Sequence, residues 1–368
     1  MGKKKKIAIV IATMNVGGAQ KVIIDILRQL LKTQHTVRLF VHEDKKENQF
    51  TKELDSMGAD VVYIHRDDRV SWKSYRGLSS ALSAYCPDVV HIHLDRLYAP
   101  VWSLLHKKRT VFTIHSQPYR IFNKKGISAL FKMLMKRKHF TLTGVSQQIS
   151  KEAAQLLKVD ISCVKTICNP VQTVDFIPHE SREKVVFVNV ARFSPIKNHF
   201  LLIKSFKRVK ETCKTAVLKL AGDGQLLEEC RCLVEEMGLS DCVTFLGNVT
   251  DVYTLLSQAD VFVLSSDSEA MPISVLEAMA CALPVVSTRV GGVAELVGED
   301  NGLLVPPKDE VALANAMVYM ADDAQFRYRC GEASFRRAAN FSAERIASEY
   351  LELYFSNFHK EMNNDDAQ

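Results

Sequence analysis

Short runs rich in Val, Ile and Phe alternate with longer amphipathic stretches along the whole chain. Apolar runs of about four to eight residues are typical of buried strands, and apolar positions at helical spacing are typical of the helices between them. The alternation therefore predicts β-α units around parallel sheets. We expect strands at 7–12, 36–42, 60–64, 88–93, 110–115 and 140–145, and again at 184–191, 215–222, 242–247, 260–265, 283–287 and 303–305.

The stretches between the strands predict amphipathic helices. In the first half they include 19–33 and 127–138, and in the second half they lie at 197–212, 225–238, 251–257, 273–282, 292–297 and 310–320. A final helix is expected near 342–358, because Ile346, Tyr350, Leu353 and Tyr354 recur there at helical spacing.

The order of strands and helices restarts midway along the 368 residues, a length greater than one ordinary core fills. The segment 169–178 is the expected linker, because its two prolines fix φ and remove backbone donors. We predict an α/β protein with two doubly wound, Rossmann-like domains facing a cleft at the carboxyl ends of their strands, where such sheets bind ligands. The expected parts are an N-terminal domain (1–178), a C-terminal domain (179–341), and a helix and tail (342–368) whose helix packs back across the domains.

The composition is that of a soluble globular protein, with 47% hydrophobic and 24% charged residues. The basic Lys3–Lys6 and apolar Ile7–Ala12 resemble a secretory signal, but the apolar run is too short and no cleavage site follows. No window holds the roughly 20 apolar residues that span a bilayer. The nine cysteines, odd in number and scattered among apolar neighbours, indicate reduced thiols, so we expect a cytoplasmic protein. Cys163, Cys168, Cys230 and Cys232 are expected to be buried structural thiols.

The net charge of +6 conceals an uneven distribution. Residues 1–180 carry 29 Lys/Arg and 15 Asp/Glu, whereas residues 181–368 carry 19 and 27. Residues 101–150 hold ten Lys/Arg and no acid. We expect an anionic partner for the first half, and our hypothesis is peripheral docking to the anionic cytoplasmic leaflet of a membrane. Nucleic acid is not expected as a partner, because no aromatic-interleaved basic motif accompanies these charges.

Candidate chemistry begins at Asn15–Gln20, which follows the first expected strand and opens the first helix. Gly17 and Gly18 allow backbone N–H groups to approach an anion at the helix N-terminus. The spacing lacks the third glycine of a dinucleotide fingerprint. By itself the motif fits an ordinary strand-to-helix turn somewhat better than a ligand site.

Arg192 and Lys197 follow the first expected strand of the second half, on either side of Pro195. A guanidinium and an ammonium so placed can converge on one diphosphate. The next strand ends in Gly222-Asp223-Gly224, which permits close approach of a ligand, although turn chemistry explains it equally well.

Residues 266–280 form the most informative segment, a polar loop with Glu269 followed by a helix that carries Glu277. Pro272 is expected in the first turn of that helix. The N–H groups at the helix start suit phosphate, and two carboxylates eight residues apart suit sugar and ribose hydroxyls. A purely solvated role fits poorly, because unpaired acids are rarely set among apolar helix residues.

Taken in this order, the motifs resemble those of glycosyltransferase family 4 along nearly all of the chain. The likeness is most specific over 189–305, in Arg192 and Lys197, Gly222–Gly224, Glu269–Glu277, Gly291-Gly292 with Glu295, and Asn301–Val305. Further matches in the first half are Gly17–Ala19, Thr113–Ser116 and Gly144–Ser146. The resemblance implies the GT-B fold and a retaining transferase. Such an enzyme would move a sugar from a nucleotide-diphosphate sugar, with a UDP-sugar favoured, to a glycan or lipid-linked acceptor in capsule or lipopolysaccharide biosynthesis.

The resemblance also implies roles for individual residues. Arg192 and Lys197 would hold the donor diphosphate, Glu277 the ribose, and Glu269 the transferred sugar. His115 would contact the reacting sugar, Gly18 would close over the phosphate, and residues 245–249 would border the nucleobase. The implied catalytic residues are His115, Glu269, Arg192 and Lys197. The implied donor-binding residues are Gly17, Gly18, Arg192, Lys197, Gly222, Asp223, Gly247, Asn248, Glu269, Ala270, Met271, Pro272, Ile273, Leu276 and Glu277.

Three positions depart from the family pattern. Ala270 and Ala282 stand where the family often has glycine, and Gln172 stands where it has Asp. A methyl group beside a sugar hydroxyl narrows the choice of donor, so the departures bear on the identity of the sugar more than on the reaction.

No cofactor or metal is expected, because Arg192, Lys197 and helix N-termini can take the charge of the leaving diphosphate. We place His91 and His93 on opposite faces of a strand, which argues against a metal cluster with His115, and no paired-ligand spacing typical of zinc occurs. Two alternatives stay open, a nucleotide-sugar epimerase of the same fold and a non-catalytic nucleotide-sugar sensor.

Overall fold

The computed structural model describes residues 3–175 and 184–356. The chain divides into two compact units, Met1–Pro170 with Ala343–Gln368, and Val171–Ser342. The domain boundary expected at 178 lies outside the described residues. Val171 itself is tied to the second unit, because its N–H donates to the carbonyl of Phe341 at 2.8 Å.

The first unit is built on a parallel sheet of seven strands in the order β3-β2-β1-β4-β5-β6-β7. Its centre is apolar, and Ile7 to Ile11 of β1 are completely buried. The strands are β1 (Lys6–Ile11), β2 (Thr36–Val41), β3 (Val61–Tyr63), β4 (Val89–His93), β5 (Arg109–Ile114), β6 (Phe140–Gly144) and β7 (Val164–Thr166).

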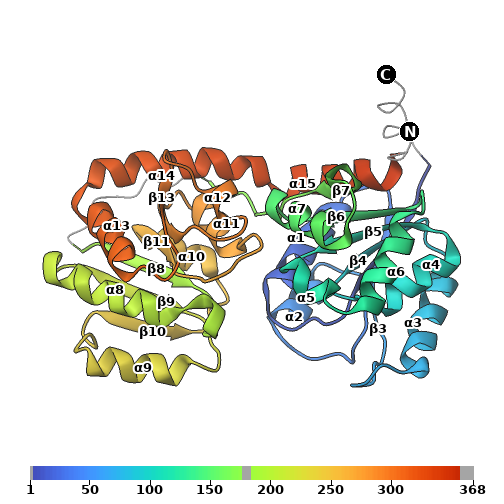
Figure 1. Ribbon diagram of the computed structural model, residues 1–368, viewed down its shortest axis with the longest axis horizontal. Helices are drawn as coiled ribbons and strands as arrows, with labels where there is room; N and C mark the ends of the chain where they lie inside the picture. The colour runs from blue at the N-terminus through green and yellow to red at the C-terminus, as the bar shows by residue number, and fades with distance from the viewer. Residues whose placement is uncertain (1–2, 176–183, 357–368) are drawn as a thin grey trace. The chain divides into compact units, whose positions relative to one another are not determined.

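Helices cover both faces of this sheet (Figure 1). The C-terminal helix α15 (Ala343–Phe355) belongs to this unit and packs on α1 and β5. The other helices are α1 (Gly18–Leu30), α2 (Gln49–Ser56), α3 (Trp72–Tyr85), α4 (Tyr98–His106), α5 (Pro118–Phe122), α6 (Lys125–Met135), α7 (Gln147–Leu157) and the short η1 (Ile161–Cys163).

The second unit has a parallel sheet of six strands in the order β10-β9-β8-β11-β12-β13. The strands are β8 (Val186–Val190), β9 (Val217–Ala221), β10 (Val243–Gly247), β11 (Val261–Leu264), β12 (Val285–Thr288) and β13 (Gly302–Val305). The helices are η2 (Pro195–Lys197), α8 (His199–Thr212), α9 (Leu227–Glu236), α10 (Val252–Ser257), α11 (Ile273–Ala280), α12 (Val293–Leu296), α13 (Glu310–Asp322), α14 (Ala324–Ala338) and η3 (Ala339–Phe341).

Both sheets confirm the doubly wound architecture expected from the sequence. The twelve expected strands are present, each within two residues of its expected ends. In each sheet the direction of winding reverses at the central strands, between β1 and β4 and between β8 and β11. The carboxyl ends of strands at such a reversal are where ligands bind in open α/β sheets.

The strand β7 and the helix α14 are among the elements that the sequence pattern did not predict. The strand β7 has only three residues, too few for a periodic signal. The buried face of α14 is made of small or weakly apolar residues, among them Cys330, Gly331 and Ala333, instead of the large aliphatic residues that mark an amphipathic helix. Within 3–175 and 184–356, no helix combines the length and apolarity needed to cross a membrane.

The small residues of α14 allow it to pack closely on the end of α11. A Cβ added at Gly331 would lie 2.3 Å from the carbonyl oxygen of Ala282. By contrast, a Cβ added at Gly126, in α6, would meet nothing within 4 Å.

Gly331→Ala is therefore expected to lower the free energy of unfolding by about 1–3 kcal/mol, because the backbone contact must open. Gly126→Ala, the matched control in another helix, should raise it by up to about 1 kcal/mol, because alanine favours the helix. Thermal unfolding of the two variants checks both signs. A Gly331→Ala variant as stable as the parent protein would contradict the packing described here.

Candidate functional site

The loop after β8 is fastened to the loop after β11 by backbone and side-chain hydrogen bonds. Asn198, with φ at +47°, caps α8 by accepting from the N–H of Leu201 at 3.2 Å. Its amide donates to Asp267 Oδ1 at 3.0 Å, and the Asp267 N–H donates to the carbonyl of Ile196 at 2.8 Å. These bonds hold the residues between Arg192 and Asn198 against the polar loop that carries Glu269.

Lys197 and Glu269, 72 residues apart in the sequence, form an ion pair at the centre of this arrangement. Lys197 Nζ lies 2.6 Å from Glu269 Oε1, and the hydroxyl of Ser266 donates to the same oxygen at 2.6 Å. The Glu269 side chain is 9% exposed and that of Lys197 is 22% exposed. An ammonium group has three N–H donors, so Lys197 can hold Glu269 and still donate to a phosphate oxygen.

Gly291 allows a third loop, after β12, to close on Glu269. Its φ is +50°, and a Cβ there would lie 1.6 Å from the carbonyl oxygen of Glu269. The neighbouring Gly292 N–H donates to the carbonyl of Ala270 at 3.0 Å. No side chain fits at position 291, because the loop after β12 packs directly on the backbone of Glu269.

Gly222 and Asp223 form a second cluster beside Arg192, as a close turn after β9. The φ of Gly222 is +135°, and a Cβ there would lie 2.0 Å from the carbonyl oxygen of Ala191. Gly222 N–H donates to the carbonyl of Gly247 at 2.7 Å, and the Asn248 amide donates to Asp223 Oδ2 at 3.4 Å. The structure thus brings together four expected donor-binding residues at the ends of β9 and β10.

The helix α11 follows the Glu269 loop directly. Pro272 is its N-cap and the helix begins at Ile273, so the expectation of a proline inside the first turn was wrong by one position. Met271 and Leu276 are buried, and Glu277 is 8% exposed. Burial, with a smaller contribution from the charge of Glu277, raises the pKa of the Cys281 thiol to about 12.

Arg192 is exposed on the loop after β8, and Ala270 is partly exposed between Glu269 and Met271. In the first unit, Gly17 is the N-cap of α1 and Gly18 its first residue. Gly17 has a φ of −179°, which is extended backbone open to any residue. A left-handed turn therefore does not account for the glycine at position 17.

Three histidines meet at the carboxyl ends of β4 and β5, contrary to the placement expected from the sequence. His91 and His93 have ring centroids 3.9 Å apart, because residues two positions apart on a strand share a face. His93 Nδ1 lies 2.7 Å from His115 Nε2. Burial lowers the pKa of His115 to about 4, so its imidazole is neutral near pH 7.

Despite this cluster, no group of three or more His, Cys, Asp or Glu is arranged to hold a metal ion in the part of the chain that the structure describes. All nine cysteines are free thiols. Cys230 is buried as expected, but Cys232 is exposed, so the expectation of a buried thiol was wrong there, and Cys163 and Cys168 are only partly buried.

Sequence reasoning missed the residues that organise these loops. Ser266 and Asn198 bind Glu269 and Asp267, respectively, and His93 binds His115. Their one signal in the sequence is position, since all three follow or end a buried strand. Polar residues there are common for many reasons, and only the contacts single these out.

Comparison with known proteins matches the two halves to two family descriptions. Residues 16–174 match "Glycosyltransferase Family 4", and residues 172–337 match "Glycosyl transferases group 1". Together the matches cover most of the chain, which belongs to glycosyltransferase family 4 and has the GT-B fold.

Two curated relatives and one solved structure illustrate the similarity. The N-acetyl-alpha-D-glucosaminyl L-malate synthase of Bacillus anthracis is 24% identical over 73% of this chain and 74% of its own length. A Campylobacter jejuni alpha-1,4-N-acetyl-D-galactosaminyltransferase, named for a diphosphoundecaprenol-linked glycan, is 25% identical over 95% of this chain and 98% of its own. The crystal structure of Anabaena HepE with UDP and glucose superimposes with a TM-score of 0.80 at 19% identity, covering 95% of this chain and 98% of that one.

One buried histidine beside the Lys197 loop gives a test of this local structure. His199 is 1% exposed and stacks on Phe193, with ring centroids 4.0 Å apart. Neither ring nitrogen has a hydrogen-bond partner in the described part of the chain. Burial, and then the charge of Lys197, lowers its pKa from 6.5 to about 4.

His199 should make the second unit less stable in mild acid. Between about pH 6.5 and 4 the unfolded chain binds a proton at His199 that the folded chain does not, so stability falls as the pH falls, by about 2 kcal/mol at pH 5 relative to pH 7. His199→Phe keeps the stacking and removes this loss. In urea unfolding at pH 7, 6 and 5, the free energy of unfolding should fall less for the variant than for the parent protein as the pH falls. An equal fall in both proteins would contradict the buried neutral imidazole.

Proposed function

We propose that this protein is a retaining glycosyltransferase that moves a sugar from a UDP-sugar to a lipid-linked glycan during the biosynthesis of a cell-surface polysaccharide. The observation that carries the donor half of the proposal is the Lys197–Glu269–Ser266 cluster at the carboxyl ends of β8 and β11. It sets a cation suited to phosphate against a carboxylate suited to sugar hydroxyls.

The proposed leaving group is a nucleoside diphosphate, whose developing charge Arg192 and Lys197 would neutralise without a metal cofactor. We propose that Glu269, whose Oε1 accepts from Lys197 and Ser266, binds hydroxyls of the transferred sugar and does not act as a nucleophile. Retention then follows from attack of the acceptor on the same face of the sugar within a short-lived ion pair. The anomeric configuration of the product would match that of the donor.

The proposed nucleobase is uracil, and the support comes from similarity. The HepE structure, similar along nearly all of this chain, contains UDP and glucose. The proposed place for the base is the end of β10, where Gly247 and Asn248 are fastened to Gly222 and Asp223.

The proposed acceptor is a glycan linked through diphosphate to a lipid. The Campylobacter relative, which covers more of this chain than the malate synthase does, is named for such an acceptor. The ten cations and no acids of residues 101–150 suit an anionic acceptor better than a neutral one.

The donor site is tested by nucleotide binding followed by transfer. A ligand at about 100 times its dissociation constant stabilises the protein by roughly 2.7 kcal/mol, so UDP and UDP-sugars should raise the melting temperature more than GDP, ADP or their sugars. With the preferred donor and a lipid-diphosphate glycan acceptor, Lys197→Ala and Arg192→Ala should each lower kcat/KM by roughly 100-fold or more.

Lys204→Ala is the matched control, because Lys204 is an exposed lysine of α8. It should transfer sugar at the rate of the parent protein. Near-normal transfer by Lys197→Ala would exclude the assigned role, and rearranged or free sugar formed without acceptor would favour an epimerase instead.

We further propose that the first unit docks on the anionic cytoplasmic leaflet through the surface of α4, α5 and α6. These helices pack together, and each exposes one large apolar residue, Leu105, Tyr119 and Met133, at 50–66% of its surface. Three exposed cations, Lys136, Arg137 and Lys138, follow directly at the end of α6. Apolar groups among cations are typical of surfaces that enter the headgroup region.

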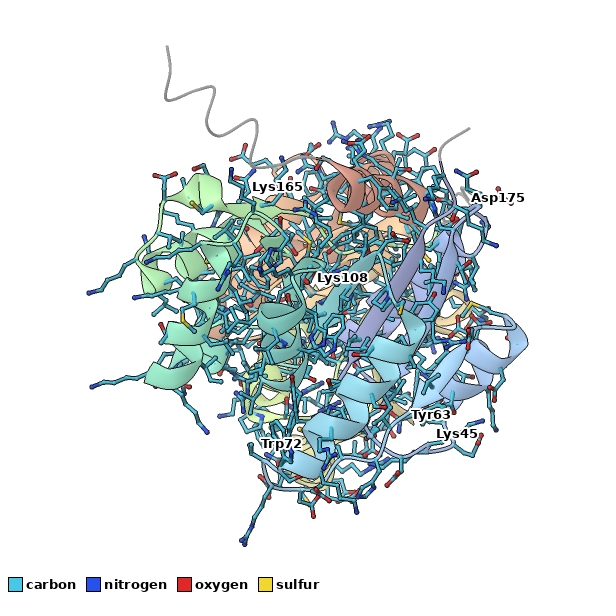
Figure 2. The ribbon with its side chains drawn as sticks, turned by 90° about the vertical axis from the view of Figure 1, so that its right-hand side faces the viewer. Lys45, Tyr63, Trp72, Lys108, Lys165 and Asp175 are labelled. Atoms are coloured by element: carbon cyan, nitrogen blue, oxygen red, sulfur yellow. The ribbon has the colours of Figure 1, made fainter. Side chains whose placement is uncertain are left out.

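In Figure 2 the labelled Lys108 lies in the connection between α4 and β5, and Trp72 is the first residue of α3. Trp72 is 70% exposed and stacks on Tyr75 at 5.0 Å. An exposed tryptophan is a further feature suited to the membrane interface.

Vesicle co-sedimentation tests the docking. Each cation near an anionic surface contributes on the order of 1 kcal/mol, so replacing Lys132, Lys136, Arg137 and Lys138 together by Ser should weaken binding to phosphatidylglycerol vesicles roughly 100-fold or more. The matched control replaces four cations of the second unit, Lys204, Lys214, Arg329 and Arg336, by Ser and should bind normally. Unchanged binding of the first variant, or equal loss in both, would refute docking through α6.

A further inference from the structure

A buried chain of hydrogen bonds runs from α15 to the strands β4, β5 and β6, and its donors can be assigned one by one. Thr143 Oγ1 donates its only hydrogen to the carbonyl of Phe112 at 3.3 Å. With the Thr143 hydrogen directed to this carbonyl, Thr113 donates in the 2.8 Å contact between the two threonine hydroxyls. The hydroxyl oxygen of Thr113 is left to accept from its other neighbours.

Those neighbours are His91 and Tyr350. His91 Nε2 lies 2.7 Å and the Tyr350 hydroxyl 3.2 Å from Thr113 Oγ1, so each donates to it. His91 therefore carries its hydrogen on Nε2, and its Nδ1 accepts from the Tyr354 hydroxyl at 2.6 Å. Both nitrogens of His91 are satisfied in the neutral form, and burial lowers its pKa well below the usual value.

His93 stands between this chain and His115. It is completely buried, with its ring centroid 3.9 Å from that of His91 and 5.0 Å from that of His115. Its Nδ1 lies 2.7 Å from His115 Nε2. Its Nε2 is buried and has no hydrogen-bond partner among the described residues.

The unpaired Nε2 decides which histidine donates. If His115 donated to His93, the hydrogen of His93 would sit on Nε2 as a buried N–H with no acceptor. If His93 donates from Nδ1, its Nε2 carries no hydrogen and is only an unused acceptor. Orphaned buried N–H groups are rarer and more costly than under-used acceptors, so the second arrangement is favoured.

We propose that His93 is a positioning residue that donates from Nδ1 to Nε2 of His115 and so keeps the hydrogen of His115 on Nδ1. The nitrogen of His115 that is left for a ligand is then a neutral hydrogen-bond donor and not a base. In the sugar transfer proposed above, on which this role rests, His115 would donate to an oxygen of the substrate. His91, which is hydrogen-bonded to Thr113 and Tyr354, packs against the ring of His93.

The tautomer can be measured without any substrate. The full chain with ¹⁵N-labelled histidine is studied by long-range ¹H–¹⁵N NMR near pH 7, and the His115 signals are identified by their loss in His115→Gln. The expected result is a hydrogen on Nδ1 of His115 and none on Nε2. A hydrogen on Nε2 would overturn the proposal, whatever the activity.

Two substitutions of His93 connect the tautomer to transfer. The amide nitrogen of His93→Asn lies as many bonds from Cα as Nδ1 and can replace the donor, whereas that of His93→Gln lies one bond farther, at the place of Nε2. His93→Asn should keep the tautomer and stay within about threefold of the parent kcat, whereas His93→Gln should lose about tenfold in kcat with little change in KM for the donor.

Equal losses in the two variants, with the His115 tautomer unchanged in both, would show a merely structural role and overturn the proposal. The proposed function fails separately, if the parent protein transfers no sugar from any nucleotide donor. A hydrogen found on Nδ1 would in that case still support the role of His93 as the donor to His115.

Discussion

The ion pair of Lys197 with Glu269 is the contact on which the second unit's site depends. It joins the loops after β8 and β11, two neighbouring strands of one sheet, and a carboxylate that is 9% exposed requires such a partner. The other loops are arranged around it. Gly291 leaves room for the loop after β12, and Ser266 supplies a second donor to the same oxygen. Burial of the carboxylate thus accounts for Lys197 and Ser266, whereas the approach of the loop to the Glu269 backbone accounts for Gly291.

In the first unit the buried histidines behind His115 are neutral and do not form an ion pair. Burial lowers the pKa of His91 and His93 well below the usual value, so the cluster behind His115 consists of uncharged rings whose hydrogens are set by their partners. Part of that order comes from Tyr350 and Tyr354, on a helix more than two hundred residues away in the sequence. Membership of α15 in the first unit is what makes these contacts possible.

Much of the fold was predictable because parallel strands buried on both faces read as apolar runs whatever their neighbours are. The loop motifs around Arg192, Glu269 and Glu277 were equally visible, since they combine unusual residues at strand ends. The helix α14 was not, because small residues such as Gly331 bury a face without leaving an apolar signal. We expected His91 and His93 on opposite faces of their strand, which was wrong because residues two positions apart on a strand share a face.

The sequence by itself determined the fold class and the family and predicted the residues of the candidate donor site, because local patterns and motif order carry that information. The tertiary structure decided which of these residues touch. That Lys197 binds Glu269, that a carbonyl leaves no room for a side chain at Gly291, and that His93 hydrogen-bonds to His115 all depend on strand neighbours far apart in the chain. Spacing along a sequence does not report distances across a sheet, since strand order is set by packing and not by chain order.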